Sequence, residues 1–391
     1  MKAIYYYLSP VILLAFAACN DNEQQSCTVT VRVIPPAMDT EVSFEDIKVT
    51  LTNKAQGTTY SALCSTEGVA SLQVEYGEYT VAVHYQTPSG IIYSGRIESL
   101  SLLPEQVETL QPVELHLTQS PTHAIVIKEI FYAGHTLELG IRYLADQYIT
   151  LYNNSDATIY LDGLCVGMVD PANSTESPWM KYTNMERIPI SSFTWQFPGS
   201  GTEYPLLPGK ETTIATNAVD HTSGEYNHPS AIDLSTADWA FWDAALDLQS
   251  INPGVKPLNL ISNLNPMMGG YNFPATGATI IVFRMEDAEN YINNPANKEL
   301  RPEATNQDRR YLMIPKEWIL DCVECIENPT LPSPKRVPAE LDNGSIYIPE
   351  GIYSGYSVIR KKAPGQTGQT IYQDTNNSTE DMEISTPTLK K

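Results

Sequence analysis

Residues 124–167 decide the fold that the sequence predicts, and they read AIVIKEIFYAGHTLELGIRYLADQYITLYNNSDATIYLDGLCVG. An apolar strand opens the stretch, a variable loop follows, and residues 147–153 predict a second strand. Asn-Asn-Ser-Asp at 153–156 predicts a turn, because these side chains hydrogen-bond their own backbone. A short strand then closes on Asp162-Gly163. The segment therefore opens a β-sandwich that the following residues complete.

Composition agrees with a loop-rich β protein. The 391 residues are 42% hydrophobic and 18% charged, with 28 Pro, 22 Gly and 23 Tyr. Pro and Gly favour turns, and Tyr favours half-buried strands. The length suits two domains. The net charge of −22 repels phosphate backbones, so nucleic acid is not an expected partner.

The N-terminus predicts export. Residues 1–18 join a positive Lys2 to an apolar run that ends in small residues, and this run is shorter than the about 20 residues that span a bilayer. Phe16-Ala17-Ala18-Cys19 resembles the lipobox of bacterial lipoproteins. The resemblance implies cleavage after Ala18, lipidation of Cys19 and a polar tether at 19–26, at the outer membrane and facing the cell surface. The alternative is an ordinary signal peptide in which Cys19 has no role.

Five further cysteines remain once Cys19 is assigned to the lipid. Cys27 opens the first module and Cys64 lies within it, so this pair is the first candidate disulfide in an oxidising envelope. Cys322 and Cys325 have CxxC spacing, but a zinc ribbon needs a second pair of ligands. They are expected to be a structural disulfide or buried thiols.

Residues 27–118 predict a small β-sandwich. Residues 28–33 and 47–52 alternate between apolar and polar types, as half-buried strands do. Gly77, Tyr79 and Val81 resemble the last strand of the carboxypeptidase-regulatory-like, transthyretin-like module. That resemblance implies a spacer or a binding platform. Residues 119–123 are the expected linker.

Five segments of residues 124–391 stand in the order found in the lamin-tail domain: Ile127–Ile130, Asp146–Asn153, Ile159–Gly163, Leu207–Lys210 and Gly277–Phe283. The second unit therefore resembles that domain, an immunoglobulin-like sandwich. Nearly the whole chain also resembles a family of Bacteroidota lipoproteins with domain of unknown function 4876. That resemblance implies a companion of a TonB-dependent transporter.

The second unit is much longer than the roughly 100 residues of one sandwich domain. We expect the excess to lie in insertions at 165–205, 217–275 and 286–345. Long loops that stay ordered are usually functional.

Motifs for catalysis do not occur: the sequence contains no G-x-S-x-G, H-E-x-x-H, Walker A or G-x-G-x-x-G pattern. His221 and His228, near Asp220 and Glu225, are a weak candidate metal site, and a solvated polar loop is the alternative. Carboxylate pairs for glycoside hydrolysis depend on three-dimensional separation and stay open.

Trp239 and Trp242 are the candidate ligand platform, because two aromatic rings flanked by Asp238 and Asp243 would stack on a sugar or a planar ligand. The alternative is a helix at 235–248, capped by Ser235, that buries Trp239 and Trp242 on one face. Aromatic residues at helical spacing usually belong to a core.

Together these patterns predict an all-β protein of two β-sandwich domains. The predicted function is an outer-membrane lipoprotein that acts as a non-catalytic binding or accessory module. The family resemblance implies a TonB-dependent transporter, in nutrient or metal-complex uptake, as its partner. No cofactor is expected. The alternatives are a surface glycan-binding protein or a glycoside hydrolase that uses loop carboxylates, and a structural adhesin.

Overall fold

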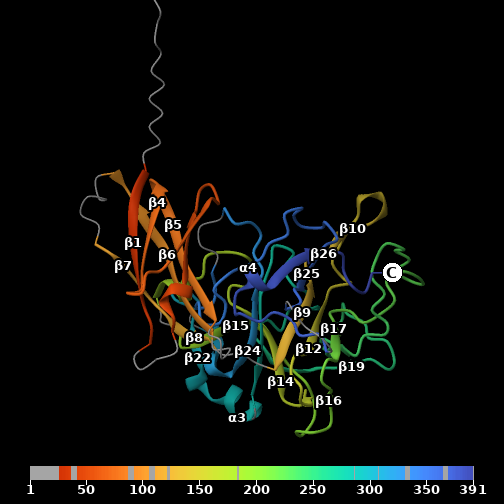
Figure 1. Ribbon diagram of the computed structural model, residues 1–391. Coiled ribbons are helices and arrows are strands. Elements are labelled where there is room, and N and C mark those ends of the chain that lie inside the picture. The colour runs from red at the N-terminus through yellow and green to blue at the C-terminus, as the bar shows by residue number, and fades with distance from the viewer. Residues whose placement is uncertain are drawn as a thin grey trace, which may run out of the picture.

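A computed structural model gives the fold and describes residues 26–36, 42–86, 92–104, 111–120, 124–182, 185–285, 287–306, 308–330, 335–363 and 369–390. The expected signal peptide, Ala18, Cys19 and nearly all of the tether lie outside these residues. Over the described ranges, no helix is long and apolar enough to cross a membrane. Two lobes are visible in Figure 1, with the first module in red to orange beside the larger second unit.

The first module is a sandwich of two sheets, with β1 at the centre of one and β2 and β5 inside the other. Alternation along these strands buries Val29, Val31, Val49 and Leu51 between the sheets. The first sheet contains β4 (Val69–Glu75), β1 (Ser26–Ile34) and β7 (Val113–His116); the second contains β3 (Thr59–Leu63), β2 (Lys48–Asn53), β5 (Gly77–Gln86), β6 (Ile92–Leu102) and β8 (Thr118–Ser120), and the 3-10 helix η1 is Phe44–Asp46.

Two details of this module differ from the sequence prediction. Strand β8 pairs with β6, so the module continues through Ser120 and the start of the expected linker is part of the sheet. Cys27 and Cys64 are free thiols and do not form the expected disulfide. Both lie in the apolar core, where burial raises the pKa of each thiol and favours the protonated form.

The second unit is a larger sandwich of two sheets. One sheet has the order β19 (Lys256–Pro257), β18 (Trp239–Ala240), β17 (Glu211–Ala215), β12 (Tyr148–Asn153), β9 (Ile125–Phe131), β25 (Ser357–Arg360) and β26 (Met382–Ser385). The other has the order β22 (Lys298–Leu300), β23 (Arg310–Pro315), β15 (Arg187–Gln196), β14 (Leu164–Val169), β21 (Thr279–Arg284) and β24 (Ile319–Glu324), with β20 (Asn259–Asn263) also paired to β15.

Short strands, helices and 3-10 turns lie outside the two large sheets. Two small ladders pair β10 (His135–Thr136) with β11 (Arg142–Tyr143) and β13 (Ile159–Tyr160) with β16 (Pro205–Leu206). The helices are α2 (Pro178–Tyr182), α3 (Ala288–Asn293) and α4 (Ser378–Asp381), and the 3-10 turns are η2 (Glu138–Gly140), η3 (Pro295–Asn297) and η4 (Lys316–Trp318).

The main core fills the space between the two large sheets. Ile127 and Ile149 come from one sheet, and Val166, Trp195 and Val282 come from the other. Every residue of β12 and β14 is buried, so these strands read as apolar runs without alternation. The all-β sandwich prediction is confirmed.

The expected insertions are partly wrong. Residues 165–205 contain nearly all of β14 and the whole of β15, and residues 286–345 contain β22, β23 and β24, all strands of the second large sheet. Residues 217–275 remain mostly irregular, with only short strands. Buried strands lack the polar alternation that marks half-buried ones, so the sequence pattern assigned them to loops.

Buried ion pairs fix the segment that begins at Lys335 to β24. Glu324 lies 3.2 Å from Arg336 Nε and 2.5 Å from Lys335 Nζ, and its side chain and that of Arg336 are fully buried. Burial raises the pKa of Glu324, but Lys335 and Arg336 lower it by more, so the carboxyl pKa lies below its usual value. Arg336 also donates to the carbonyls of Ala172, Gly277 and Cys325.

Candidate functional site

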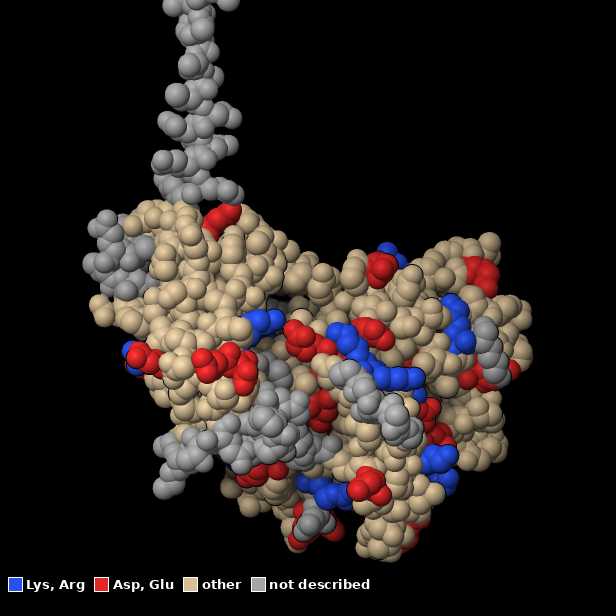
Figure 2. Space-filling model, viewed as in Figure 1, with Lys and Arg blue, Asp and Glu red and all other residues tan. Residues whose placement is uncertain are grey.

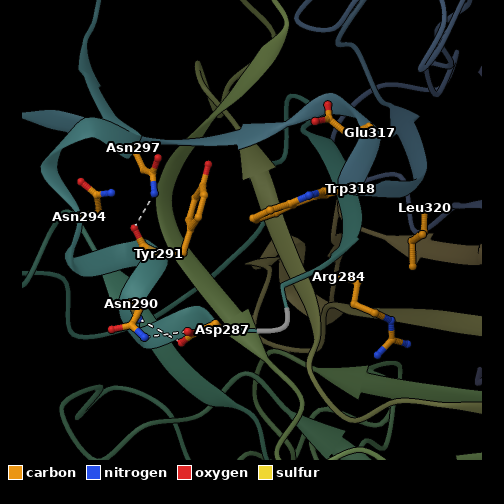
Figure 3. Close-up of a pocket in the computed structure, with 9 residues that line it drawn as sticks. All are labelled: Arg284, Asp287, Asn290, Tyr291, Asn294, Asn297, Glu317, Trp318 and Leu320. Carbon is orange, nitrogen blue, oxygen red and sulfur yellow. Dashed lines mark hydrogen bonds between the residues drawn. The ribbon is translucent and has the colours of Figure 1, made fainter.

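A pocket of about 680 Å³ lies on the second unit, mostly within the expected insertion at 286–345. Figure 3 shows its lining side chains. They come from the end of β21, the α3–η3 segment, η4 and β24, and they are Arg284, Asp287, Asn290, Tyr291, Asn294, Asn297, Glu317, Trp318 and Leu320. This size is typical of small-molecule sites.

Local capping positions the polar side chains of this pocket. Asp287 caps α3: it accepts from the backbone N–H of Asn290 at 3.4 Å and from the Asn290 amide at 2.7 Å. Asn294 caps η3 by accepting from the Ala296 N–H at 3.0 Å. Asn297 donates to the Tyr291 carbonyl at 3.0 Å. Two successive caps therefore bring three amides to one rim.

Tyr291 and Trp318 form the aromatic wall. Their ring centroids are 4.7 Å apart with an interplanar angle of 54°, and Figure 3 shows the rings side by side. Both are half-buried and pack on a core cluster at the second large sheet. The Tyr291 hydroxyl donates to the Met313 carbonyl at 2.7 Å, and burial raises its pKa, so the phenol stays neutral. The pair is therefore held in place before any ligand arrives.

The charged groups of the pocket differ in how firmly they are fixed. Arg284 donates to the carbonyls of Asp162 at 2.6 Å and Tyr160 at 2.8 Å. Asp287 and Glu317 are exposed to solvent. An aromatic wall, three amides and two carboxylates supply an apolar face together with hydrogen-bond donors and acceptors. Molecules with both kinds of surface, such as saccharides, match this combination.

Trp239 does not form an exposed platform. It is 3% exposed on β18, and its ring packs edge-on against Phe197 and Tyr204. Trp242 is half-buried and donates to the Gln249 carbonyl at 3.3 Å. The core interpretation of Trp239 is therefore confirmed, although a strand and not a helix places it.

The expected helix at 235–248 is wrong. Asp238 accepts from the backbone N–H of Thr213 at 2.9 Å, which draws β18 onto the edge of β17. The Ser235 N–H and hydroxyl donate to Asp233, so Ser235 belongs to a turn and caps no helix. Asp243 likewise accepts from the Ala245 N–H in a turn. The local side-chain bonds compete with helix formation here.

His221 belongs to a buried aromatic cluster. Its Nδ1 lies 2.6 Å from the Tyr143 hydroxyl and its Nε2 lies 2.9 Å from the Asn217 carbonyl. His228 packs edge-on against Tyr143 with centroids 5.0 Å apart. Burial lowers the pKa of His221, so its neutral form is favoured. Among the described residues, no group of three His, Cys, Asp or Glu side chains could hold a metal ion.

Cys322 and Cys325 are free, buried thiols on and beside β24. Burial raises the pKa of both, so the thiolate form is disfavoured. Of the two expectations for this CxxC, the structure has buried thiols.

Exposed aliphatic side chains gather at loop tips of the second unit. Leu139 is 100% exposed and Ile141 is 47% exposed, both on the loop between β10 and β11. Ile352 is also exposed, and the carbonyl of its neighbour Tyr353 accepts from the Thr136 hydroxyl at 3.1 Å, which joins the two loops. Exposed aliphatic groups on two joined loops are a candidate contact surface.

Sequence reasoning did not single out the pocket residues. Asp287, Asn290 and Asn294 follow a capping pattern that would have located α3, because Asp and Asn favour the first position of a helical turn. Trp318 carries no such signal. It reaches Tyr291 only because α3 packs against the second large sheet.

Comparison with known proteins gives one family. The model of a family described as "Protein of unknown function (DUF4876)" matches residues 207–388, which therefore carry a DUF4876 domain. The chain is also similar to a crystal structure of a DUF4876 family protein from Bacteroides thetaiotaomicron VPI-5482. The TM-score is 0.61 and the identity 25%, over 91% of this chain and 94% of that chain. No curated protein matches the chain.

Proposed function

We propose that this protein is a lipid-anchored, non-catalytic saccharide-binding protein of the outer membrane, and that the whole chain belongs to the DUF4876 family. The observation that carries the binding function is the pocket in which Tyr291 and Trp318 face three asparagine amides. Aromatic rings cover the apolar face of a sugar ring, while amides donate to and accept from its hydroxyl groups.

The exposure of both carboxylates supports binding over hydrolysis. A glycosidase needs one carboxyl whose pKa is raised so that it protonates the leaving oxygen, and burial is the usual cause. Asp287 and Glu317 are exposed, and Asp287 is already engaged as the cap of α3. The two groups therefore suit hydrogen bonding to hydroxyls.

A glycan array tests this function. The mature chain is labelled and compared with Trp318→Ala and with Trp242→Ala, a matched control that removes a half-buried Trp outside the pocket. We expect wild type and Trp242→Ala to bind the same glycans and Trp318→Ala to lose them. Equal binding by all three proteins would show that the glycans do not bind in the Tyr291–Trp318 pocket.

The lipid anchor rests on Phe16–Cys19 and on the polar tether that follows. Cys19→Ser should move the protein from the membrane fraction to the soluble fraction after cell lysis. A Cys19→Ser variant that stays with the membrane would contradict the anchor.

The proposed partner is a TonB-dependent transporter, and the exposed aliphatic groups Leu139, Ile141 and Ile352 support a contact surface on the second unit. Affinity capture from native outer membranes should recover one transporter in stoichiometric amount. Replacing all three by Ser should abolish that recovery. Leu63→Ser, at a 62% exposed Leu of the first module, is the matched control and should not. Recovery of the lipoprotein alone would contradict this partner.

A further inference from the structure

A groove separates the two units and carries a second set of hydrogen-bonding side chains. It consists of two adjoining cavities of about 480 and 290 Å³, which share Thr52, Thr59 and Arg96. Figure 2 shows the hollow between the two lobes. Ligand sites occur preferentially at such interfaces between domains.

One wall of the groove is an array of hydroxyl groups. Thr50 and Thr52 alternate with the buried Val49 and Leu51, so they lie on the outer face of β2. Strand pairing places Thr50 opposite Ser61 and Thr52 opposite Thr59. Among the described residues, none of these four hydroxyls has a hydrogen-bond partner within the protein, and all four line the larger cavity.

The floor of the groove holds an unmatched acceptor. Asn343 is 1% exposed and joins the units: its amide donates to the Val83 carbonyl at 2.7 Å, and its carbonyl accepts from Arg96 at 2.8 Å. Its side-chain Oδ1 is buried without a partner among the described residues. Asn343 lines the larger cavity, and its buried, unpaired Oδ1 marks a hydrogen bond that the described residues do not complete.

The opposite wall is rigid. Thr375 donates to Asp381 at 2.6 Å, and Thr379 donates to the Ser345 carbonyl at 2.8 Å. These hydroxyls are committed to the protein, so the available groups are those of β2 and β3. The asymmetry means that a ligand would hydrogen-bond mainly to the first module.

The cations of the groove select the charge of a ligand. Lys48 continues the Thr50–Thr52 face of β2 and is exposed, whereas Arg96 forms an ion pair with Glu98 at 2.8 Å and donates to the Asn343 carbonyl. Glu380 is the one carboxylate lining the larger cavity, within the described residues. Across both cavities Lys48, Lys54, Arg96 and Lys335 stand against the carboxylates of Glu98 and Glu380. Arg96 is paired with Glu98, and Lys335 with the buried Glu324, so Lys48 and Lys54 supply the positive charge that attracts a carboxylate.

We propose that this groove is a second binding site, separate from the Tyr291–Trp318 pocket, and that it takes an acidic saccharide of the uronic-acid class. The ligand hydroxyls bond to Thr50, Thr52, Thr59 and Ser61. The carboxylate lies toward Lys48. The first module then acts as half of a binding site as well as a spacer.

Isothermal titration of the full mature chain with a trigalacturonate, and with the neutral galactose trisaccharide, tests the proposal. We expect wild type to bind the acidic probe at least tenfold more tightly than the neutral one. Thr50→Val with Thr52→Val, which keeps shape and strand propensity, should weaken binding at least tenfold. Lys48→Gln is a second variant and should reduce the preference for the acidic probe.

Two control proteins show whether the loss of binding is specific to the groove. Thr28→Val with Thr30→Val makes the same change on β1, in the other sheet of the module, and should bind as wild type does. Trp318→Ala should also retain the acidic probe, so the two sites fail independently. The proposal is overturned if wild type does not bind trigalacturonate, or if the Thr50/Thr52 variant binds it unchanged.

Discussion

Arg336→Met tests whether the buried ion pairs hold the segment that begins at Lys335 in place. Met keeps much of the length of the side chain but removes the charge and every donor. Glu324 would lose one of its two cationic partners, and the carbonyls of Gly277 and Cys325 would lose the donors that reach them at 3.2 and 2.5 Å. Removing one partner of a buried pair typically costs about 3–5 kcal/mol.

The expected loss in the free energy of unfolding is therefore about 3–5 kcal/mol at pH 7. Urea unfolding followed by tryptophan fluorescence measures it. The matched control is Arg187→Met, because Arg187 and Glu299 form an ion pair whose side chains are 35% and 39% exposed. Exposed pairs contribute about 0–1 kcal/mol. If Arg336→Met costs no more than Arg187→Met, the buried network does not anchor this segment and the reasoning is refuted.

Three further predictions concern loops that shape the second unit. Burial raises the pKa of Asp162, but three backbone N–H groups lower it by more, so the carboxyl pKa lies below its usual value. The ionised carboxylate therefore stabilises the folded state fully at neutral pH, and this contribution is lost as pH falls through the lowered pKa. Asp162→Asn should reduce the free energy of unfolding, measured by urea titration, at pH 7 and much less at pH 3. Burial lowers the pKa of His221, so the loop that contains it should lose stability as pH falls below about 6.5. His221→Phe should remove this pH dependence, which hydrogen exchange at the neighbouring Tyr143 would measure. An unchanged pH profile in the variant would contradict this prediction. Gly344→Ala should lower the melting temperature, because the new Cβ would overlap Asn377 Oδ1 and the Thr379 backbone, and a variant as stable as wild type would mean that the loop shifts freely.

The sequence predicted the strands that alternate or that sit between clear turns. Residues 28–33 and 47–52 lie within or nearly within β1 and β2, and the strand at 147–153 nearly coincides with β12. The second large sheet was harder, because β14 and β15 are buried on both faces or nearly so and carry no alternation. Their apolar runs read as parts of long loops.

The pocket shows why sites are harder to predict than strands. Tyr291 and Trp318 are far apart in sequence, and no spacing rule brings them together; packing of α3 on the sheet does. Trp239, by contrast, had the more conspicuous sequence pattern and is buried in the core. Two aromatic residues close in sequence therefore predict a binding site less well than two aromatic rings in contact in the structure.

The dissociation constant of the strongest array glycan, measured by isothermal titration, tests the central claim most directly. We expect Trp318→Ala to raise it at least tenfold, which corresponds to about 1.4 kcal/mol, and Trp242→Ala to leave it unchanged. The circular dichroism spectra of the three proteins should coincide, so that the difference reports the pocket. A Trp318→Ala protein with wild-type affinity would contradict the account.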